Sequence, residues 1–133
     1  MRAIAIERDA MRSAVIARNA AALGVPDLRV VQAAAPAALA GLPVPDAIFL
    51  GGSVSDAVLW EALWKALKLG GRLVANAVTV EGEMQLARWH ARFGGEMTRV
   101  AVSRAEPVGG YSGWRSSMSV TQLAVVKPRE KVK

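Results

Sequence analysis

The sequence has no cysteine, a single histidine and few aromatic residues, which make up 5% of the chain. Without cysteine, the chain forms no disulfide and carries no thiolate nucleophile or metal ligand. One histidine with no cysteine argues against a zinc centre, so we expect no bound metal. Few aromatic side chains are available for stacking on bases, which argues against a nucleic-acid partner.

Long apolar runs are also missing. No segment reaches the roughly 18 apolar residues that a membrane-spanning helix requires. The stretch from Met1 to Glu7 is too short and too soon charged to be a secretory signal peptide. We therefore expect a cytoplasmic protein that does not enter a membrane.

The remaining composition is that of a folded domain with unevenly distributed charge. The chain has 133 residues, of which 53% are hydrophobic, and its net charge is +6. Residues 1–66 hold six basic and six acidic side chains, whereas residues 67–133 hold eleven basic and five acidic ones. A basic second half suits an anionic partner, either nucleic acid or a polycarboxylate. The alternative is a solvated surface followed by a basic tail at residues 127–133.

Short β-rich runs alternate with helical patterns along the chain, which predicts an α/β fold of the order βαβαβαβαββ. Such units predict a mostly parallel sheet with helices on both faces. The last two strands have no helix between them, only a glycine-rich loop at residues 106–116, so they should pair antiparallel at one sheet edge. The expected strands are residues 2–7, 28–33, 46–50, 72–78, 96–105 and 117–126. The expected helices are residues 9–23, 36–42, 80–93 and one capped by Ser53 or Ser55 that carries Leu59, Leu63 and Leu67.

Ligands of open α/β sheets bind beyond the carboxyl ends of the strands. Glu7 ends the first expected strand, where a carboxylate can accept two hydrogen bonds from ribose hydroxyls. Its alternative role is a surface acid paired with Arg8 or Arg12. Gly51 and Gly52 end the third strand and would let a ligand approach the backbone, although four Gly-Gly pairs in the chain make this signal weak.

Other polar and aromatic residues carry weaker signals. Asn76 falls where a buried strand meets the ligand face, and its amide either binds substrate or caps a loop. Trp60 and Trp64 lie four residues apart on one helix, which indicates packing. His90 is expected on a helix surface or in packing. One histidine and scattered serines give no serine–histidine–acid set, so the sequence assigns no catalytic residue.

Two runs of residues closely resemble the decarboxylating precorrin methyltransferases of cobalamin biosynthesis. These runs are Pro45 to Ser53 (PDAIFLGGS) and Gly70 to Glu81 (GGRLVANAVTVE). The segments Ala5 to Arg8, Ala34 to Pro36 and Gly109 to Gln122 also fit, so the resemblance covers nearly the whole chain.

The resemblance implies a class I S-adenosylmethionine-dependent methyltransferase fold, which is Rossmann-like with the usual strand order 3-2-1-4-5-7-6. It implies S-adenosyl-L-methionine as cofactor and a precorrin, a tetrapyrrole with many carboxylates, as substrate. The reaction would methylate C15 and remove the carboxyl group of the C12 acetate. It also suggests a homotetramer.

The expected site residues follow from the resemblance and from the strand ends. Cofactor contacts are expected from Glu7, Arg8, Ala34, Ala35 and Gly51. Substrate contacts are expected from Gly52, Asn76, Thr79, Tyr111, Trp114 and Arg115. Arg115 could hold a ring carboxylate in a bidentate contact and Trp114 could lie against the macrocycle. Otherwise Trp114 is a buried loop anchor and Arg115 a solvated charge.

One feature of the family has no counterpart in the sequence. Family members begin with a first strand and a glycine-rich loop, whereas here the first strand is the one that ends in Glu7. We expect residues 1–126 to form a single methyltransferase-like domain, truncated at its N-terminus relative to the family. The absent central strand would leave unpaired backbone groups beside its neighbours.

Two other functions compete with the precorrin reaction. The fold is shared by methyltransferases acting on RNA or protein, and fold alone does not fix function. Against them, the chain has no Asn/Asp-Pro-Pro-Tyr/Phe run, and only Tyr111 and Trp114 are aromatic residues in a loop. The third alternative is a non-catalytic interaction module that pairs through exposed strands.

Overall fold

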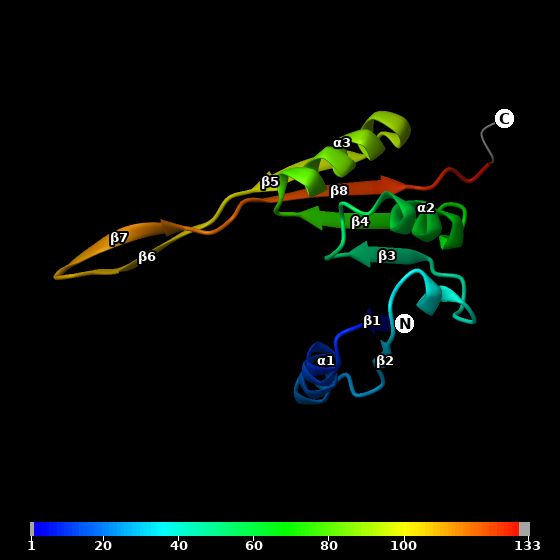
Figure 1. Ribbon diagram of the computed structural model, residues 1–133, viewed down its shortest axis with the longest axis horizontal. Coiled ribbons are helices and arrows are strands. Elements are labelled where there is room, and N and C mark those ends of the chain that lie inside the picture. Colours follow the sequence, from blue (N-terminus) through cyan, green and yellow to red (C-terminus); the bar gives the residue numbers. More distant parts are fainter. Residues whose placement is uncertain (1, 131–133) are drawn as a thin grey trace. The chain divides into compact units, whose positions relative to one another are not determined.

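The structure is a computed structural model that describes residues 2–130. The strands are β1 (Ile4–Glu7), β2 (Arg29–Gln32), β3 (Ala47–Leu50), β4 (Arg72–Ala77), β5 (Glu96–Val100), β6 (Ser103–Val108), β7 (Tyr111–Ser116) and β8 (Val120–Val126). The helices are α1 (Ala10–Ala22), α2 (Ala57–Ala66) and α3 (Val80–Phe93), with a 3-10 turn at Ala37–Leu39. Figure 1 shows these elements along the chain. The chain groups into two compact units, Met1–Pro43 and Val44–Lys133, called unit 1 and unit 2 below.

Unit 1 is one β-α-β motif. β1 and β2 form a parallel two-stranded sheet in which Glu7 is aligned with Gln32. The connecting helix α1 begins after Asp9, whose carboxylate accepts the backbone N–H of Arg12, as the sequence predicts. Ser13 and Ala20 are its buried residues.

Unit 2 contains a four-stranded sheet of order β3-β4-β8-β5. β3 and β4 are parallel, and β8 is antiparallel to both β4 and β5. The last strand of the unit therefore lies inside the sheet, and β5 is at its edge. The expected antiparallel pairing of the last two sheet strands is confirmed, but only β5 occupies the edge.

The strand orders match the resemblance. The pairs β2-β1 and the series β3-β4-β8-β5 correspond to the segments 3-2 and 4-5-7-6 of the expected order. The strand numbered 1 in that order, which lies between strands 2 and 4, has no counterpart among the described residues. Within residues 2–130, β1 has β2 as its only partner strand and β3 has β4 as its only partner strand.

The core of unit 2 lies between one face of this sheet and the helices α2 and α3. Alternate residues of β4 and β8 are buried on this face, with Leu73 and Leu123 fully buried. Trp60 of α2 stacks on Trp89 of α3 with ring centroids 4.8 Å apart, and the Trp60 indole N–H donates to the Val54 carbonyl at 2.6 Å. The packing role predicted for Trp60 is thus confirmed. Both helices of this unit lie over one face, rather than being divided between two.

Two tight connections hold the ends of these helices. Lys127 donates from Nζ to the carbonyls of Trp64 and Leu67, each at 2.6 Å, which satisfies carbonyl groups at the C-terminal end of α2. After α3, Gly95 has a φ of 100°, and a Cβ there would lie 2.5 Å from the Ala124 carbonyl oxygen. Only glycine fits this turn into β5.

Three sequence expectations need correction. The segment expected to be a glycine-rich loop lies within the hairpin β6–β7, because Gly109 and Gly110 form a two-residue turn between paired strands. The cap of α2 is Asp56, which accepts the N–H groups of Val58 and Leu59, rather than Ser53 or Ser55. The expected strand 96–105 is divided into β5 and β6.

The basic tail expected at residues 127–133 lies in part outside the described residues. Of its basic side chains, Lys127 donates hydrogen bonds to carbonyl groups at the C-terminal end of α2, as described above. Within residues 2–130, no helix is both long and apolar enough to cross a membrane.

Candidate functional site

In unit 1, the expected cofactor residues gather at one end of the β1–β2 sheet. Glu7 is the last residue of β1, and Ala34 and Ala35 follow the end of the parallel strand β2. The Glu7 carbonyl accepts the Ala33 N–H at 3.1 Å and the Ser13 hydroxyl at 3.1 Å, which joins both strand ends to α1. The carboxyl edge predicted from the sequence is therefore formed.

The Glu7 carboxylate is held by two donors on one of its oxygens. Glu7 Oε1 accepts the backbone N–H of Asp9 at 2.9 Å and Nη2 of Arg12 at 2.9 Å. The Arg12 hydrogen bond, followed by that from Asp9, lowers the pKa of Glu7 to about 2. Glu7 is therefore ionised at neutral pH, and the hydrogen bonds from Asp9 and Arg12 both fall on Oε1. Arg8, the next expected cofactor residue, is exposed.

In unit 2, a pocket of about 210 Å³ lies beyond the carboxyl ends of β3 and β4. Its lining consists of Gly51, Gly52, Ser53, Val54, Ser55, Asn76, Val78 and Thr79, which we call the strand-end pocket. The structure thus brings together four residues predicted from the sequence: Gly51 for cofactor, and Gly52, Asn76 and Thr79 for substrate. No charged side chain is part of this lining.

Backbone and side-chain geometry shape the strand-end pocket. Ser53 has a φ of 54°, in the left-handed region that non-glycine residues seldom occupy. Thr79 caps α3, with its hydroxyl oxygen accepting the Gly82 N–H at 3.1 Å. Asn76 Oδ1 accepts Nε2 of Gln122 at 2.8 Å across the β4–β8 pairing.

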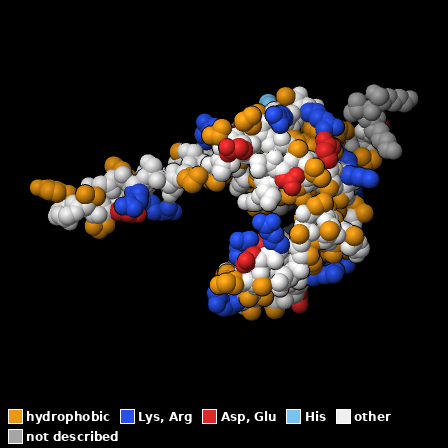
Figure 2. All heavy atoms as spheres, in the orientation of Figure 1, with side chains coloured by type: hydrophobic (Ala, Val, Ile, Leu, Met, Phe, Trp, Pro, Cys, Tyr) orange, Lys and Arg blue, Asp and Glu red, His pale blue; other side chains and the backbone are white. Residues whose placement is uncertain are grey.

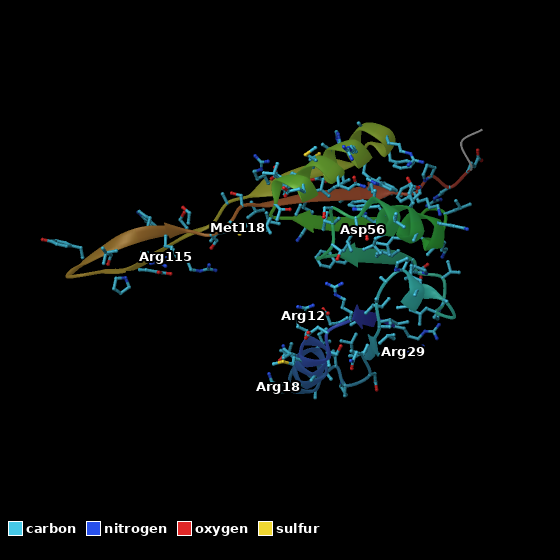
Figure 3. The ribbon with its side chains drawn as sticks, in the orientation of Figure 1. Arg12, Arg18, Arg29, Asp56, Arg115 and Met118 are labelled. Carbon is cyan, nitrogen blue, oxygen red and sulfur yellow. The ribbon has the colours of Figure 1, made fainter. Side chains whose placement is uncertain are left out.

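The remaining expected substrate residues lie on the hairpin β6–β7 (Figure 3). Tyr111 and Trp114 are 86% and 79% exposed, so Trp114 is not the buried anchor that was the alternative. Arg115 pairs with Glu106 at 2.8 Å within the hairpin. Strand alternation places Trp114 on the opposite face of the hairpin from Arg115. One flat ligand therefore cannot lie against both side chains on a single face.

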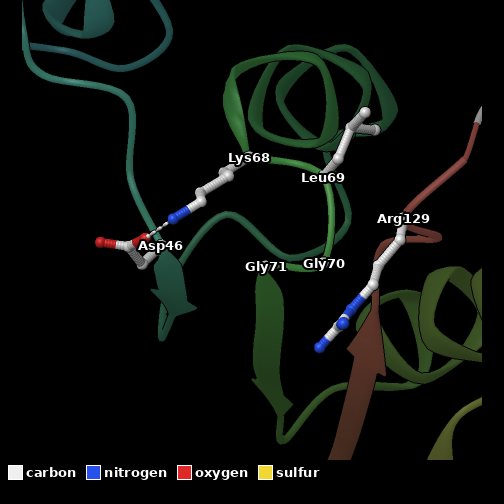
Figure 4. A pocket seen from close by; sticks show the side chains of 6 residues that line it. All are labelled: Asp46, Lys68, Leu69, Gly70, Gly71 and Arg129. Carbon is white, nitrogen blue, oxygen red and sulfur yellow. Dashed lines mark hydrogen bonds and ion pairs between the residues drawn. The ribbon is translucent and has the colours of Figure 1, made fainter.

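A second pocket of unit 2, about 430 Å³, lies at the other end of the strands (Figure 4). Asp46, Lys68, Leu69, Gly70, Gly71 and Arg129 line it, and Lys68 Nζ donates to Asp46 Oδ1 at 2.6 Å. Asp46 and Gly71 precede β3 and β4, so this pocket faces the amino ends of the parallel strands. Ligands of such sheets bind at the carboxyl ends, so the smaller strand-end pocket is the better candidate.

Comparison with known proteins identifies the family. A family model described as the precorrin methyltransferase domain matches residues 1–127. The chain belongs to this family.

Individual relatives agree with this assignment. A Sinorhizobium protein named precorrin-6Y C(5,15)-methyltransferase (decarboxylating) is 54% identical over 127 residues, which are 96% of this chain and 31% of that protein. The chain thus spans about a third of the relative's length. The solved C-terminal domain of precorrin-6Y C5,15-methyltransferase from Rhodobacter capsulatus is 44% identical with a TM-score of 0.88, covering 95% of this chain and 68% of that one.

The fold also extends to a more distant protein. A SAM-dependent O-methyltransferase from Thermotoga maritima matches with a TM-score of 0.69 at 15% identity, covering 99% of this chain and 52% of that one. This likeness concerns the fold alone. The chain therefore has the Rossmann-like class I methyltransferase fold that the sequence resemblance implied.

Sequence reasoning missed several residues that line the strand-end pocket. Ser53, Val54, Ser55 and Val78 were not assigned to the site, and Ser53 and Ser55 were proposed as helix caps. The signal available was their position directly after two strand ends that were already assigned to the ligand face. Gln122 was also missed, because its contact with Asn76 depends on the pairing of strands that are 46 residues apart.

Proposed function

We propose that this chain is the part of a decarboxylating precorrin methyltransferase that binds S-adenosyl-L-methionine and the tetrapyrrole substrate in cobalamin biosynthesis. The observation that carries the proposal is the 54% identity to a precorrin-6Y C(5,15)-methyltransferase (decarboxylating) along 96% of this chain. We propose methylation of C15 and loss of carbon dioxide from the C12 acetate. The cytoplasmic location and single-domain organisation stay predictions of the sequence.

The cofactor contact with the clearest chemistry is Glu7. Ribose hydroxyls are hydrogen-bond donors, and Glu7 offers an ionised carboxylate whose bonds to Asp9 and Arg12 are both made through Oε1. The residues of unit 1 therefore fit a ribose at this strand end. Ala34 and Ala35 are exposed at the same edge, where small side chains leave room for an adenine ring. We also assign Arg8 and Gly51 to the cofactor, as the resemblance implies.

The substrate contacts are assigned to the strand-end pocket and to the hairpin. Methylation needs the ring carbon held in line with the methyl donor, which is a matter of positioning. Gly52, Asn76 and Thr79 provide a backbone approach, an amide and a hydroxyl for this purpose. Decarboxylation breaks the bond between the acetate methylene and its carboxylate. The electron pair passes into the ring as carbon dioxide leaves from a poorly solvated site, and a proton taken up from water then converts the methylene into a methyl group.

The hairpin offers further contacts, from Tyr111 and Arg115 on one face and from Trp114 on the other. Because Arg115 pairs with Glu106, a substrate carboxylate would compete with that side chain for the guanidinium group. An Arg115→Ala variant should raise the apparent KM for the precorrin and leave the cofactor affinity unchanged. Unchanged kinetic constants would remove Arg115 from the substrate site.

We further propose a homotetramer. β5 lies at the edge of the sheet with every residue exposed, and the hairpin exposes the apolar side chains of Val108 and Trp114. Figure 2 shows hydrophobic atoms along this projecting arm. Exposed strand edges with apolar side chains favour pairing with another copy. Multi-angle light scattering in the micromolar range tests this, and a monomer would contradict it.

The central experiment is incubation of the chain with S-adenosylmethionine and a precorrin, followed by mass spectrometry. The expected product has gained one methyl group and lost one carbon dioxide. Calorimetry separates cofactor binding from turnover: Glu7→Ala should weaken cofactor binding at least about tenfold, because two charge-assisted hydrogen bonds are lost.

Arg12→Ala is the matched control for that measurement. It removes the same ion pair as Glu7→Ala but keeps the carboxylate. If both variants lose the same affinity, the ion pair rather than the ribose contact explains the loss.

A further inference from the structure

The polar groups of the strand-end pocket are all neutral. Its polar side chains are the hydroxyls of Ser53, Ser55 and Thr79 and the amide of Asn76. A hydroxyl can turn to donate or accept a hydrogen bond, but an amide presents a donor on one side and an acceptor on the other. The orientation of Asn76 therefore decides which kind of ligand group this pocket prefers.

A neighbouring strand fixes that orientation. Asn76 on β4 and Gln122 on β8 are paired residues, and both side chains are half-buried on the sheet face opposite the helices. Gln122 Nε2 donates to Asn76 Oδ1 at 2.8 Å, so Asn76 Oδ1 faces Gln122 and one of its two acceptor positions is used. The Asn76 N–H₂ group makes no side-chain hydrogen bond within residues 2–130. Gln122 itself is not part of the pocket lining.

We propose that Gln122 is a positioning residue: by holding Asn76 Oδ1, it directs the Asn76 N–H₂ group to the ligand, so that the strand-end pocket selects a carboxylate. This inference rests on the proposed function, in which the substrate is a polycarboxylate. Reversal of the Asn76 amide would present an oxygen to that carboxylate and create repulsion. Gln122 thus sets specificity without touching the substrate.

The test uses acetate as a carboxylate probe and needs no precorrin. Sodium acetate is titrated into the ¹⁵N-labelled chain, with sodium chloride as the ionic-strength reference. The readout is the shift of the backbone amide signals of Gly52 and Thr79, together with the Asn76 side-chain N–H₂ signal. In the wild type, all of these signals should move with acetate alone.

Three variants separate orientation from simple packing. Gln122→Glu can only accept from Asn76, so it turns the N–H₂ group away from the pocket, and acetate affinity should fall at least about tenfold. Gln122→Met leaves Asn76 free to adopt both orientations, so the competent fraction is about one half and affinity falls about twofold. Asn76→Asp keeps an acceptor for Gln122 but presents a charged oxygen to the pocket, and acetate binding should be lost.

A matched control corrects for added charge. Thr98 on β5 is aligned with Gln122 on its other side, so Thr98→Glu adds a carboxylate nearby without contacting Asn76. This variant should bind acetate within about threefold of the wild type. Dispersed amide spectra and unchanged thermal midpoints establish that each variant is folded; Asn76→Asp decides the matter if Gln122→Glu does not fold.

The outcomes that overturn the proposal are distinct. They are an absence of acetate-dependent shifts in the wild type, acetate binding by Asn76→Asp, or equal losses in Gln122→Met and Gln122→Glu. Failure of the precorrin turnover experiment would leave these binding results unchanged, so the two proposals fail separately.

Discussion

Unit 2 contains two regions that use the same residue types in opposite ways. In the sheet body, Trp60 is fully buried, stacks on Trp89 and donates to the Val54 carbonyl. In the hairpin β6–β7, Trp114 is 79% exposed. Hydrophobic burial stabilises the body, whereas the hairpin is ordered by strand pairing and leaves its large side chains free for a ligand or another copy.

The largest expected difference in the free energy of unfolding is between substitutions of Trp60 and of Trp114. Trp60→Ala should lower the free energy of unfolding by about 3–5 kcal/mol, because it leaves a cavity and an unpaired carbonyl. Trp114→Ala should change it by less than about 0.5 kcal/mol. Urea unfolding followed by far-UV circular dichroism measures both. A Trp114→Ala loss comparable to that of Trp60→Ala would mean that the hairpin packs as a core element.

The second comparison concerns hydroxyl groups. Thr121 is buried and donates to Glu83 Oε1 at 2.6 Å, so Thr121→Val should cost about 1–3 kcal/mol. Ser116 of the hairpin bonds Ser103 at 2.9 Å in an exposed setting, and Ser116→Ala should cost less than about 0.5 kcal/mol. The same urea measurement applies. Equal effects would show that burial does not distinguish the two regions.

The pH dependence of the sheet body gives a third, smaller effect. The Thr121 hydrogen bond, with help from the charge of Arg99, lowers the pKa of Glu83 below its usual 4.5. A carboxyl whose pKa is lower in the folded state stabilises the protein above its unfolded pKa. We expect this contribution to be complete above pH 4.5 and to be lost as the pH falls further.

Unfolding measured from pH 7 downward tests this expectation. The free energy of unfolding of Glu83→Gln should change less with pH than that of the wild type below the pKa that Glu83 has in the unfolded state. Parallel curves for the two proteins would contradict the role of Glu83.

The smallest expected effect on stability is that of the hairpin ion pair. The side chains of Arg115 and Glu106 are 77% and 45% exposed. Exposed ion pairs contribute little, so Arg115→Ala should change the free energy of unfolding by less than about 0.5 kcal/mol. Its effect on the precorrin KM is therefore readable without a stability correction. A thermal midpoint that drops by many degrees would show that the pair orders the hairpin.

Local sequence signals predicted the elements well where one residue type decided them. Asp9 caps α1, and the predicted helix over residues 80–93 has the same bounds as α3. The cap of α2 was wrong because Ser53, Ser55 and Asp56 all suit an N-cap, and only the backbone path selects Asp56. The hairpin was missed although Gly109-Gly110 is a known two-residue turn signal.

Only those residues of the candidate site that lie at strand ends could be predicted from the sequence. Glu7, Gly52, Asn76 and Thr79 were predicted from strand ends, and the structure places each of them at or next to the end of β1, β3 or β4. Arg12 was named only as an alternative partner of Glu7, and that ion pair forms. Gln122 could not be found by pattern, because strand register brings it to Asn76. The family resemblance supplied the strand order, which local periodicity does not contain.

The position of β8 inside its sheet has a consequence for protein synthesis. β5 has no described partner strand other than β8, and β4 has no partner on that side until Val120–Val126 is available. Once α3 and β5 have left the ribosome, the edges of β4 and β5 that pair with β8 therefore stay unpaired until the hairpin and β8 have been translated. During that interval the exposed strand edges favour pairing with other chains, and the sheet is completed only when β8, the last of its four strands in chain order, is available.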